Sequence, residues 1–527
     1  RDNVFILSGT VNAYLKLKKR KVYATFIDLK RAFDTVNHDK LWYKLYNLGV
    51  SRKLLQIIRV LYDNAVMLIS DESSSSIEIP VSEGILQGEV LSPALFSLYI
   101  YNIVQVFNDS VGIPLYKNRD LQILLYADDI VLFSPTWIEA QRKLNLLKEC
   151  CDENLLKVNI KKTVTMVFTQ SGTFTEKKLL KYGNDPIDYQ KKFIYLGVPI
   201  ASSAKFVQAT KYFLGKNMVA TQSALALLKS CKSDSWETKC KLYDAISESV
   251  LLYLSEVWAC RYTDEVERGQ LRFFKLLLHL PRSTPNPYVR MECGRVHLKF
   301  KVFRRMLSWW RIILKMPDHH LSKMCYLKLL DLEDNKGMTF NWARELKQYL
   351  SCIGFENIWR AQNLKLVEDN YQSIIAGFEN NLISRDVEAI VNSRYNLTYR
   401  NLSTYDLNEP HFKINMHISK LRLIVQLRLS NKKNCRINFN NQYYQFDIDL
   451  ICNLCQLHAP NDLFHFLMSC PALSSYRSKY FEKYFPALPT TDCDKFVSLM
   501  NFSIDNCEEK IKAVFLFCME SFKLINS

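Results

Sequence analysis

Three aspartates stand next to apolar segments, and their positions indicate a metal-dependent reaction. Asp128 and Asp129 interrupt the apolar run ILLYADDIVLF (123–133), and Asp28 directly follows the apolar segment 22–27. Burying a carboxylate is costly unless a cation compensates its charge, and hard divalent cations such as Mg2+ prefer oxygen ligands. Two such ions about 3.5–4 Å apart would stabilise the attacking and leaving oxygens of a phosphoryl transfer. The simpler alternative is a hairpin tip whose acids are solvated.

A second group of residues has the spacing of a structural zinc site. Cys452, Cys455, His465 and Cys470 follow the pattern C-x2-C-x9-H-x4-C. Three thiolates and one imidazole can close a tetrahedron around Zn2+, and the ion would fold a segment too small for a core of its own. The alternatives are reduced cysteines buried beside a core histidine, or a site in which His458 is the histidine ligand.

Two basic stretches predict contacts with a polyanion. Residues 391–440 contain nine basic residues against two acidic ones, and residues 299–315 contain six basic residues and no acid. In the first stretch we expect salt-dependent phosphate contacts from Lys420, Arg422, Arg428, Lys432, Lys433 and Arg436. Faces for stacking unpaired bases are expected from Tyr443, Tyr444 and Phe446. The alternatives are a solvated helix face for 391–440 and, for 299–315, a core helix containing Trp309 and Trp310.

The elements that position these residues alternate between strand and helix over the first two hundred residues, which indicates an α/β or α+β fold. We expect strands at 22–27, 163–168 and 193–198, a hairpin of 66–70 with 77–81 around the polar run 71–76, and helices at 38–48, 52–64 and 137–156. Asn37, Ser51 and Ser92 are placed as helix N-caps, with Pro93 at the first helical position after Ser92. From about residue 205 the pattern is helical throughout, with PRSTPNP (281–287) as a linker.

Composition agrees with a folded protein that has a polyanionic partner. The chain has 527 residues and 70 Lys and Arg against 53 Asp and Glu, a net charge of +17, which favours nucleic acid. An apolar content of 48% excludes general disorder, and the length predicts two to four domains. Fifteen cysteines, an odd number at irregular spacing, favour a reducing compartment. We find no membrane-spanning run and no signal peptide, so no membrane partner is expected.

Three short motifs resemble, in order and in separation, those of reverse transcriptases: FIDLKRAFD (26–34), GILQGEVLSP (84–93) and YADD (126–129). Two segments continue the likeness: LKVNIKKTVTMVF (156–168), and FIYLGVPI (193–200), which is similar to a primer-grip hairpin. Three more resemble LINE-like, non-LTR retrotransposon polymerases: LLYLSEVW (251–258), LPRSTPNPYVRMECG (280–294) and HFLMSCPALSSYR (465–477). The resemblance covers nearly the whole chain and is strongest over 22–200.

The resemblance implies a role for each residue of the predicted active site. Asp28 and Asp128 would bind two Mg2+ ions, Asp129 would support the site, and Lys162 would assist the departure of pyrophosphate. The remaining positions would bind substrate: Phe33 as the aromatic gate that excludes a ribose 2′-hydroxyl, Gln87 and Gly88 around the nucleotide and template base, and Tyr126 beneath the primer terminus. For Phe33, a plain core phenylalanine is the alternative.

The same resemblance implies an α+β fold: a right-hand polymerase palm of antiparallel sheet and helices, a helical thumb, a helical C-terminal region and a small zinc knuckle. The expected segments are partial fingers and palm at 1–202, thumb and post-thumb at 203–320, a helical basic nucleic-acid-binding region at 321–440, a CCHC zinc knuckle at 441–480 and a helical tail at 481–527.

The implied function is RNA-directed DNA synthesis by a non-LTR retrotransposon protein, with element RNA as template, nicked target DNA as primer, and dNTPs. It implies action in the nucleus after a cytoplasmic ribonucleoprotein stage; protein partners are not indicated. Because only 27 residues precede Asp28, we expect the upstream fingers strands to be missing, and we find no endonuclease or ribonuclease H motif. The alternatives are a group II intron-like reverse transcriptase and an inactive or domesticated RNA-binding protein that keeps the fold.

Overall fold

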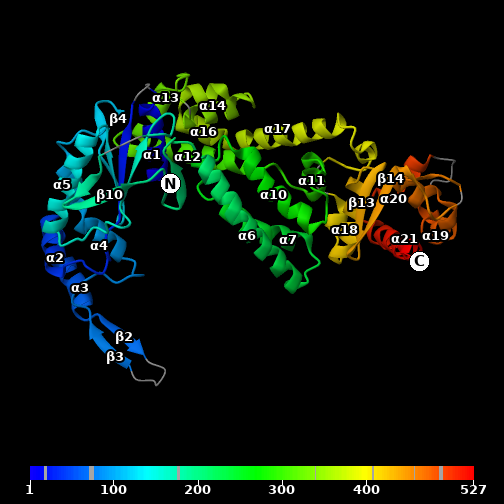
Figure 1. Cartoon of the computed structure of the whole chain (residues 1–527), viewed down its shortest axis with the longest axis horizontal. Coiled ribbons are helices and arrows are strands. Elements are labelled where there is room, and N and C mark those ends of the chain that lie inside the picture. The colour runs from blue at the N-terminus through cyan, green and yellow to red at the C-terminus, as the bar shows by residue number, and fades with distance from the viewer. Residues whose placement is uncertain are drawn as a thin grey trace. The chain divides into compact units, whose positions relative to one another are not determined.

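The computed structural model describes residues 1–16, 20–70, 76–174, 178–338, 340–405, 407, 409–455, 457–485 and 491–526. The chain divides into two compact units (Figure 1). Unit 1 comprises Arg1–Ala209 and Ile312–Glu345, and unit 2 comprises Thr210–Arg311 and Leu346–Ser527. Residues 321–345, expected with the C-terminal basic region, therefore pack in unit 1.

Unit 1 is built on a six-stranded sheet in the order β6-β7-β1-β8-β10-β9. The apolar strand β1 (Val22–Ile27) lies inside the sheet and is buried at all six residues. It is antiparallel to both of its neighbours, β7 (Asp129–Ser134) and β8 (Val164–Phe168). The other strands are β6 (Ile123–Tyr126), β9 (Leu180–Tyr182) and β10 (Asp185–Tyr189), of which β10 runs parallel to β8. This mixed, mainly antiparallel sheet with helices confirms the α+β expectation.

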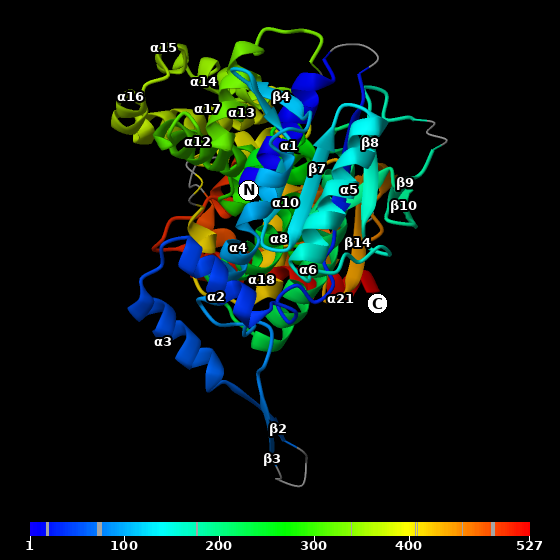
Figure 2. The same cartoon turned by 90° about the vertical axis from the view of Figure 1, so that its left-hand side faces the viewer.

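Helix α5 (Trp137–Glu153) covers one face of the sheet and contacts β1, β7 and β9 (Figure 2). The core on this side continues into α2 (His38–Asn47), α3 (Arg52–Asp63), α4 (Ser92–Tyr99) and the 3-10 helix η1 (Tyr101–Phe107). Phe26 of β1 packs instead against Phe193 and Tyr195, which belong to the hairpin of β11 (Lys192–Tyr195) and β12 (Val198–Ala201).

The first helix, α1 (Asp2–Tyr14), packs on α13 (Leu321–Asp331) and on the small hairpin of β4 (Ile113–Tyr116) and β5 (Arg119–Leu121). Gly9 allows the close approach to α13, because a Cβ there would lie 2.5 Å from the Cys325 Sγ. This packing joins two segments of unit 1 that are more than three hundred residues apart, and no local sequence pattern predicts it.

The predicted N-caps are confirmed at two of three positions. Asn37 accepts a hydrogen bond from the Lys40 N–H, and Ser51 accepts one from the Leu54 N–H. Ser92 was placed wrongly: α4 begins at Ser92 itself with Leu91 as N-cap, and the Ser92 hydroxyl donates to the Leu86 carbonyl at 2.6 Å. The predicted hairpin forms from β2 (Val66–Ser70) and β3 (Ser76–Pro80), and residues 71–75 of its polar run lie outside the described residues.

Unit 2 begins as a helical assembly, as predicted. The α-helices before the C-terminal sheet are α6 (Val207–Cys231), α7 (Trp236–Leu242), α8 (Ser249–Leu251), α9 (Ser255–Trp258), α10 (Thr263–Leu277), α11 (Asn286–Cys293), α12 (Lys299–Lys315), α14 (Trp342–Ser351), α15 (Glu356–Ala361), α16 (Leu364–Asp369), α17 (Tyr371–Val391) and α18 (Ile418–Leu429). Three of these helices, α6, α12 and α14, have residues in both units. In α12 both Trp309 and Trp310 are fully buried. The basic stretch 299–315 is therefore a core helix on the side of its tryptophans.

The C-terminal part of unit 2 differs from the all-helical expectation. β13 (Asn434–Phe439) and β14 (Gln442–Ile451) form an antiparallel hairpin, and β15 (Pro460–Asn461) pairs with β14. Side chains alternate along β13, with Ile437 and Phe439 buried and Asn434 and Arg436 exposed, a strand period that the charge count of this segment concealed. The helices α19 (Ser474–Tyr480), α20 (Asp492–Met500) and α21 (Cys507–Asn526) follow.

Candidate active site and metal centre

The paired aspartates lie on a tight turn, as their sequence context predicts. Tyr126, the last residue of β6, pairs with Asp129, the first residue of β7, so Ala127 and Asp128 form the turn. Ala127 has a φ of 51°, a left-handed conformation that costs energy for an L residue and that closes the two-residue connection. The turn therefore presents two successive carboxylates at the end of the hairpin.

Strand register brings Asp28 to the same place. Ile27 pairs with Ile130 in the antiparallel ladder of β1 and β7, so Asp28, one residue later, comes opposite Asp129, one residue earlier. The backbone at Asp28 is fixed on its other side, because its N–H donates to the Thr163 Oγ1 at 3.2 Å and its carbonyl accepts from the Asn159 N–H at 2.7 Å. Three aspartates from two distant segments thus meet where β1 ends and β6 turns into β7.

A cavity of about 310 Å³ opens beside these carboxylates. Asp28, Asp129 and Lys162 all line it, together with Phe26, Ile27, Ile130, Lys161, Val164, Gln190, Phe193 and Tyr195. The structure therefore places the lysine expected to act on the leaving group in the same cavity as two of the predicted metal ligands.

The electrostatics of this cavity favour cation binding. Partial burial, together with the negative charges of Asp128 and Asp28, raises the pKa of Asp129. Carboxylates that repel one another in this way gain from a shared cation. The donor set fits Mg2+, a hard ion that takes carboxylate oxygens, and Asp28, Asp128 and Asp129 are the residues that would hold it.

Phe33 and Gln87 lie together in a neighbouring part of unit 1. The Ile85 N–H donates to the Phe33 carbonyl at 2.8 Å, and the Gln87 side-chain amide donates to Asp34 Oδ1 at 2.9 Å. Gly84 allows this approach, since it has a φ of +86° and a Cβ there would lie 2.7 Å from the Asp34 carbonyl oxygen. Gln87 and Asp34 line a separate cavity of about 550 Å³.

The other predicted substrate residues are accessible. Gly88 is exposed with a φ of +92°, and a Cβ there would meet no atom within 4 Å, so a ligand can approach its backbone. Tyr126 is 61% exposed beside the aspartate turn. The half-buried Phe33 ring stacks on Phe96 at 4.7 Å between centroids, which combines the predicted gate position with a packing contact.

Two residues of this region were missed in the sequence. The Asn3 side-chain amide donates to the Leu125 carbonyl at 2.9 Å and to the Tyr195 hydroxyl at 3.2 Å. It thereby ties α1 to the strand before the aspartate turn and to a residue that lines the cavity. The only sequence signal was an asparagine at the start of a mostly apolar helix.

The predicted zinc ligands are brought together. The four ligand atoms of Cys452, Cys455, His465 and Cys470 all lie within 4.8 Å of one another. The Cys452 and Cys470 sulfurs are 4.0 Å apart, and the Cys455 sulfur is 3.4 Å from His465 Nε2. Burial and the Cys452 thiol raise the pKa of Cys470 to about 12, and a bound Zn2+ would reverse this by favouring the thiolate.

The local backbone explains this geometry. Cys452 directly follows β14, and its N–H donates to the Ala459 carbonyl at 2.8 Å, which closes the loop that carries Cys455. Asp462 accepts from the His465 N–H at 2.7 Å. His458 is exposed and lies outside the four-residue cluster. The residues present fit a structural zinc ion held by His465 as predicted.

The basic residues of 391–440 divide into exposed and buried members. Lys433 and Arg436 are exposed, and Lys420 and Arg422 are half-buried. The prediction is wrong for Arg428, which is 1% exposed and paired with Glu292 and Glu409. It is also wrong for Lys432, which is 6% exposed and donates to the Leu427 carbonyl. These two side chains are already satisfied inside the protein and cannot reach a phosphate.

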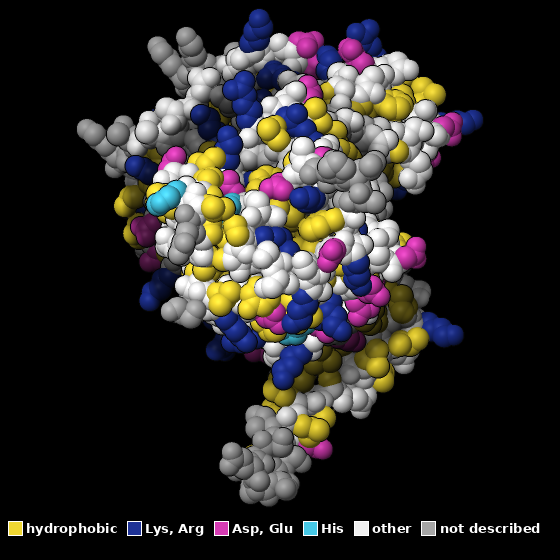
Figure 3. All heavy atoms as spheres, turned by 90° about the vertical axis from the view of Figure 1, so that its right-hand side faces the viewer, with side chains coloured by type: hydrophobic (Ala, Val, Ile, Leu, Met, Phe, Trp, Pro, Cys, Tyr) yellow, Lys and Arg dark blue, Asp and Glu magenta, His cyan; other side chains and the backbone are white. Residues whose placement is uncertain are grey.

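Of the predicted stacking residues, only Tyr443 is available. It is 68% exposed, whereas Tyr444 and Phe446 are buried and pack with Phe522. On the face of the molecule shown in Figure 3, Lys and Arg side chains are spread out with Asp and Glu among them. On this face, basic and acidic side chains are therefore mixed and do not gather into one basic patch (Figure 3).

Comparison with known proteins finds a family match for the first part of the chain. Residues 3–200 match the family described as reverse transcriptase (RNA-dependent DNA polymerase). The chain is 25% identical, over 70% of its length, to a polyprotein from the type-1 retrotransposable element R2 of Nasonia vitripennis, and that match covers 35% of the relative. It is 25% identical, over 48% of its length, to an RNA-directed DNA polymerase from the mobile element jockey of Drosophila funebris, and that match covers 28% of the relative.

The chain thus spans well under half the length of these relatives. Among solved structures, a telomerase from Candida albicans in complex with a telomeric RNA fragment is 12% identical, with a TM-score of 0.34 over 66% of this chain and 54% of that chain. A score this low supports no statement about the fold. Within the described residues, no helix is long and apolar enough to cross a membrane.

Proposed function

Residues 3–200 form a reverse transcriptase domain, and from this premise we propose that the chain is the polymerase part of a non-LTR retrotransposon protein. It would add dNTPs to a primer 3′-hydroxyl on an RNA template. The observation that carries the proposal is the register that sets Asp28 opposite Asp129 while Asp128 occupies the turn. The relatives that match are proteins of such elements, which favours this class over a group II intron-like enzyme.

Each side chain has a defined part in the proposed reaction. Asp28 and Asp128 would hold two Mg2+ ions with the support of Asp129, and ions held there would lower the pKa of the primer hydroxyl and neutralise charge on the triphosphate. Lys162 faces the same cavity and would give a proton to the departing pyrophosphate. Phe33 would exclude a 2′-hydroxyl, Gln87 and Gly88 would border the nucleotide and the template base, and Tyr126 would support the primer terminus.

The remaining parts of the proposal concern partners and place of action. Element RNA would be the template and nicked target DNA the primer, so synthesis would take place in the nucleus after assembly of a cytoplasmic ribonucleoprotein. The zinc cluster at 452–470 would act as a knuckle beside the nucleic acid. Of the basic residues first considered, Lys420, Arg422, Lys433 and Arg436 keep this role in the proposal.

A primer-extension assay tests the polymerase activity. The full chain is incubated with a poly(rA) template, an oligo(dT) primer, labelled dTTP and Mg2+. We expect incorporation by the parent chain, and loss to below about 1% in Asp128→Asn, because a neutral amide would be a much weaker Mg2+ ligand than a carboxylate. The matched control is Asp109→Asn, an exposed aspartate of the same unit, which should extend the primer normally.

The same assay separates the polymerase from its main alternative. A catalytically inactive RNA-binding protein would bind the primer–template and extend nothing. Binding without incorporation by both the parent chain and Asp109→Asn would therefore reject the polymerase and favour that alternative.

A further inference from the structure

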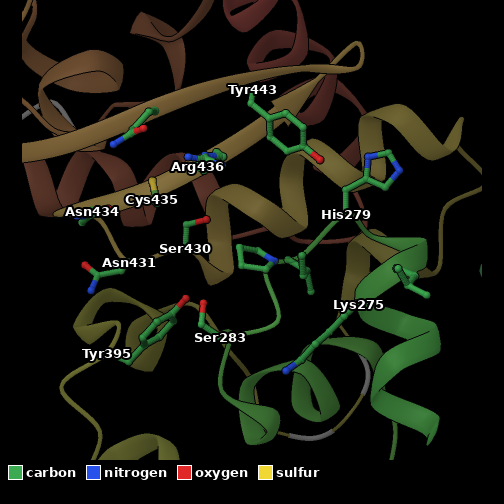
Figure 4. Close-up of a pocket in the computed structure, with 14 residues that line it drawn as sticks. Lys275, His279, Ser283, Tyr395, Ser430, Asn431, Asn434, Cys435, Arg436 and Tyr443 are labelled. Carbon is green, nitrogen blue, oxygen red and sulfur yellow. The ribbon is translucent and has the colours of Figure 1, made fainter. Parts of the chain in front are cut away.

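Unit 2 contains a cavity of about 630 Å³ to which no function has yet been given (Figure 4). Its volume lies within the range of about 300–1,000 Å³ that is usual for ligand sites. One side is the exposed face of the hairpin β13–β14, which carries Arg436 and Tyr443. The other side is formed by the end of α10 and the segments after α10, α17 and α18, represented by His279, Ser283, Tyr395 and Asn431.

The hairpin is built to present polar groups to this cavity. Asn434, Arg436, Tyr443 and Gln445 all line it, and Arg436 pairs with Gln445 across the two strands. The alternate residues point into the core, where Phe439 and Tyr444 pack on Phe522 of α21. One face of the hairpin therefore packs mainly in the core, and the other presents its polar side chains to the cavity, which the partly buried Cys435 also lines.

The lining is basic and rich in neutral hydrogen-bonding groups. Among the described residues that line the cavity there is no acid, and its cationic side chains are Lys275 and Arg436. Lys275 is committed to the protein, since its Nζ donates to the Arg282 and Thr284 carbonyls and to Asn286 Oδ1 at 2.6–3.0 Å. Arg436 is exposed, with its guanidinium 5.9 Å from the centre of the Tyr443 ring. A cation and an aromatic face thus stand side by side.

The lining continues past His279 into a smaller cavity of about 160 Å³, which His279 also lines. His279 adopts a left-handed conformation with a φ of 55° just after α10. Its Nδ1 lies 3.2 Å from Asn438 Oδ1 of β13, which fixes the ring between the two cavities. The described residues of the second lining again include no acid: Ser419, Arg422, Asn438, Phe439, Asn440 and Asn441.

We propose that these two cavities form one track for unpaired nucleotides of a single-stranded nucleic acid, with Tyr443 stacking on a base and Arg436 contacting the backbone phosphates. Asparagine, glutamine and serine side chains along the track would hydrogen-bond to base edges and sugars. The pairing of an exposed ring with a guanidinium is the recognition set of single-strand binding sites. An acidic peptide would use the cation but neither the ring nor the amides. The residues of the track all belong to unit 2, whereas those of the polymerase cavity belong to unit 1, and the proposal does not depend on polymerase activity.

Fluorescence anisotropy with the full chain tests the track. The probes are a labelled 12-nucleotide oligo(U), the matching oligo(dT) and a 12-base-pair duplex, at about 0.15 M salt. We expect both single strands to bind more tightly than the duplex, and the tighter of the two identifies the strand that uses the track. Tyr443→Ala should weaken single-strand binding about 5- to 100-fold, the range for loss of one base–aromatic stack, whereas Tyr443→Phe should keep parent affinity.

Arg436→Gln should also weaken binding and reduce the dependence of log Kd on log salt by about 0.7. The matched control is Lys512→Gln on α21, an exposed cation outside both cavities, which should leave affinity and slope within about 2-fold of the parent. Because Tyr443 and Arg436 are exposed, melting temperatures should not change.

Three results would overturn the track. They are parent affinity in Tyr443→Ala, equal weakening in Tyr443→Ala and Tyr443→Phe, or displacement of oligo(U) by poly(Glu) at equal charge concentration, which would mark an acidic-peptide site. Photo-crosslinking of 5-iodouridine-substituted oligo(U) gives an independent reading. The crosslinked peptide should contain Tyr443 or His279, and crosslinks confined to unit 1 would contradict the proposal.

Discussion

At the residue scale, Phe33 combines an observed packing contact with a proposed role in sugar selectivity. Its ring is stacked on Phe96 with 20° between the planes and is half-buried, so it cannot move aside without losing that contact. If the incoming sugar binds beside this ring, as proposed, a ring held in place could reject a 2′-hydroxyl, because selectivity against a small group requires a rigid steric barrier.

We expect Phe33→Ala to admit ribonucleotides. The ratio of kcat/KM for dTTP to that for rUTP should fall about 10- to 100-fold, mainly through faster rUTP incorporation, and should be measured by single-nucleotide extension. Phe96→Leu serves as the comparison, since it loosens the stacking but keeps the Phe33 ring, and its ratio should fall much less. An unchanged ratio in Phe33→Ala would leave Phe33 as a core residue only.

The surroundings of two buried glutamates of unit 2, Glu292 and Glu409, shift their pKa values in opposite directions. Burial acts to raise the pKa of Glu292, but the charges of Arg428 and His411 outweigh it and lower that pKa to about 2. Burial and the Glu292 charge together raise the pKa of Glu409 to about 7. Folded Glu409 therefore binds protons more tightly than unfolded Glu409, and its contribution to stability, present at pH below about 4.5, is lost as pH rises through about 7.

Glu409→Gln should remove this pH dependence. A glutamine resembles the protonated glutamate, so the melting temperature of Glu409→Gln minus that of the parent should increase between pH 6 and pH 8. Differential scanning fluorimetry at both values measures it. A difference that stays constant over this interval would show that Glu409 does not titrate there.

At the element scale, unit 2 is held together by buried ion pairs between helices. Arg428 of α18 bonds to Glu292 of α11 at 2.7 Å, to Glu409 at 2.6 Å and to the Met500 carbonyl of α20 at 2.7 Å. Arg290 of α11 similarly joins Glu267 of α10 to Asp386 of α17. Removing one partner of such a buried pair leaves an unpaired charge, which costs more than the pair itself contributes.

Arg428→Met should therefore destabilise unit 2 by about 3–5 kcal/mol. The free energy of unfolding from urea titration, followed by tryptophan fluorescence, measures this. The matched control Arg436→Met replaces an exposed arginine of the same unit and should change stability by less than about 0.5 kcal/mol. Adding Glu292→Gln to Arg428→Met should recover part of the lost free energy of unfolding. Equal stability of Arg428→Met and Arg436→Met would contradict the role of the buried Arg428 ion pairs.

A second prediction at this scale concerns metal binding by the cluster of Cys452, Cys455, His465 and Cys470. Mass spectrometry of the purified chain should find about one zinc per molecule. Cys455→Ser should reduce this to near zero and lower the melting temperature, because a bound zinc ion would contribute to the stability of the folded segment. Cys352→Ser, an exposed cysteine of the same unit, should keep the metal. Full zinc content in Cys455→Ser would exclude Cys455 as a ligand.

Local signals made much of unit 1 and its site predictable from the sequence. The mostly apolar strand 22–27, the acids in an apolar hairpin and the caps Asn37 and Ser51 each depend on signals within a few residues, and all appear as predicted. The roles of Lys162, Phe33, Gln87, Gly88 and Tyr126 stay predictions, since the geometry places these residues without showing what they bind.

What could not be predicted depends on distant partners. Arg428 looked like a phosphate ligand because Glu292, which neutralises it, is 136 residues away in the chain. The hairpin β13–β14 was missed for a different reason: a count of charges over 391–440 ignores the local alternation that puts Ile437 and Phe439 in the core. His279 gave no signal at all, since only the fold brings it beside Asn438.

At the scale of the whole molecule, the basic residues behind the net charge of +17 lie in different environments. Some of them, such as Arg428 and Arg290, pair with buried carboxylates inside unit 2. Others, such as Arg436 and Arg422, line cavities in which none of the described lining residues is acidic. The negative charge that matters for chemistry is concentrated at Asp28, Asp128 and Asp129. This arrangement agrees with the proposals of a metal site at the three aspartates and a nucleic-acid track in unit 2.

The most direct measurement of the central claim is template-dictated addition of a single nucleotide. The full chain is given a defined RNA template, an annealed DNA primer, Mg2+ and one dNTP at a time, with the template base opposite the addition site varied through all four identities. We predict that only the complementary dNTP is added, by the parent chain and by Asp109→Asn, and that Asp128→Asn adds none. Addition that ignores the template base, or that survives in Asp128→Asn, would contradict the account.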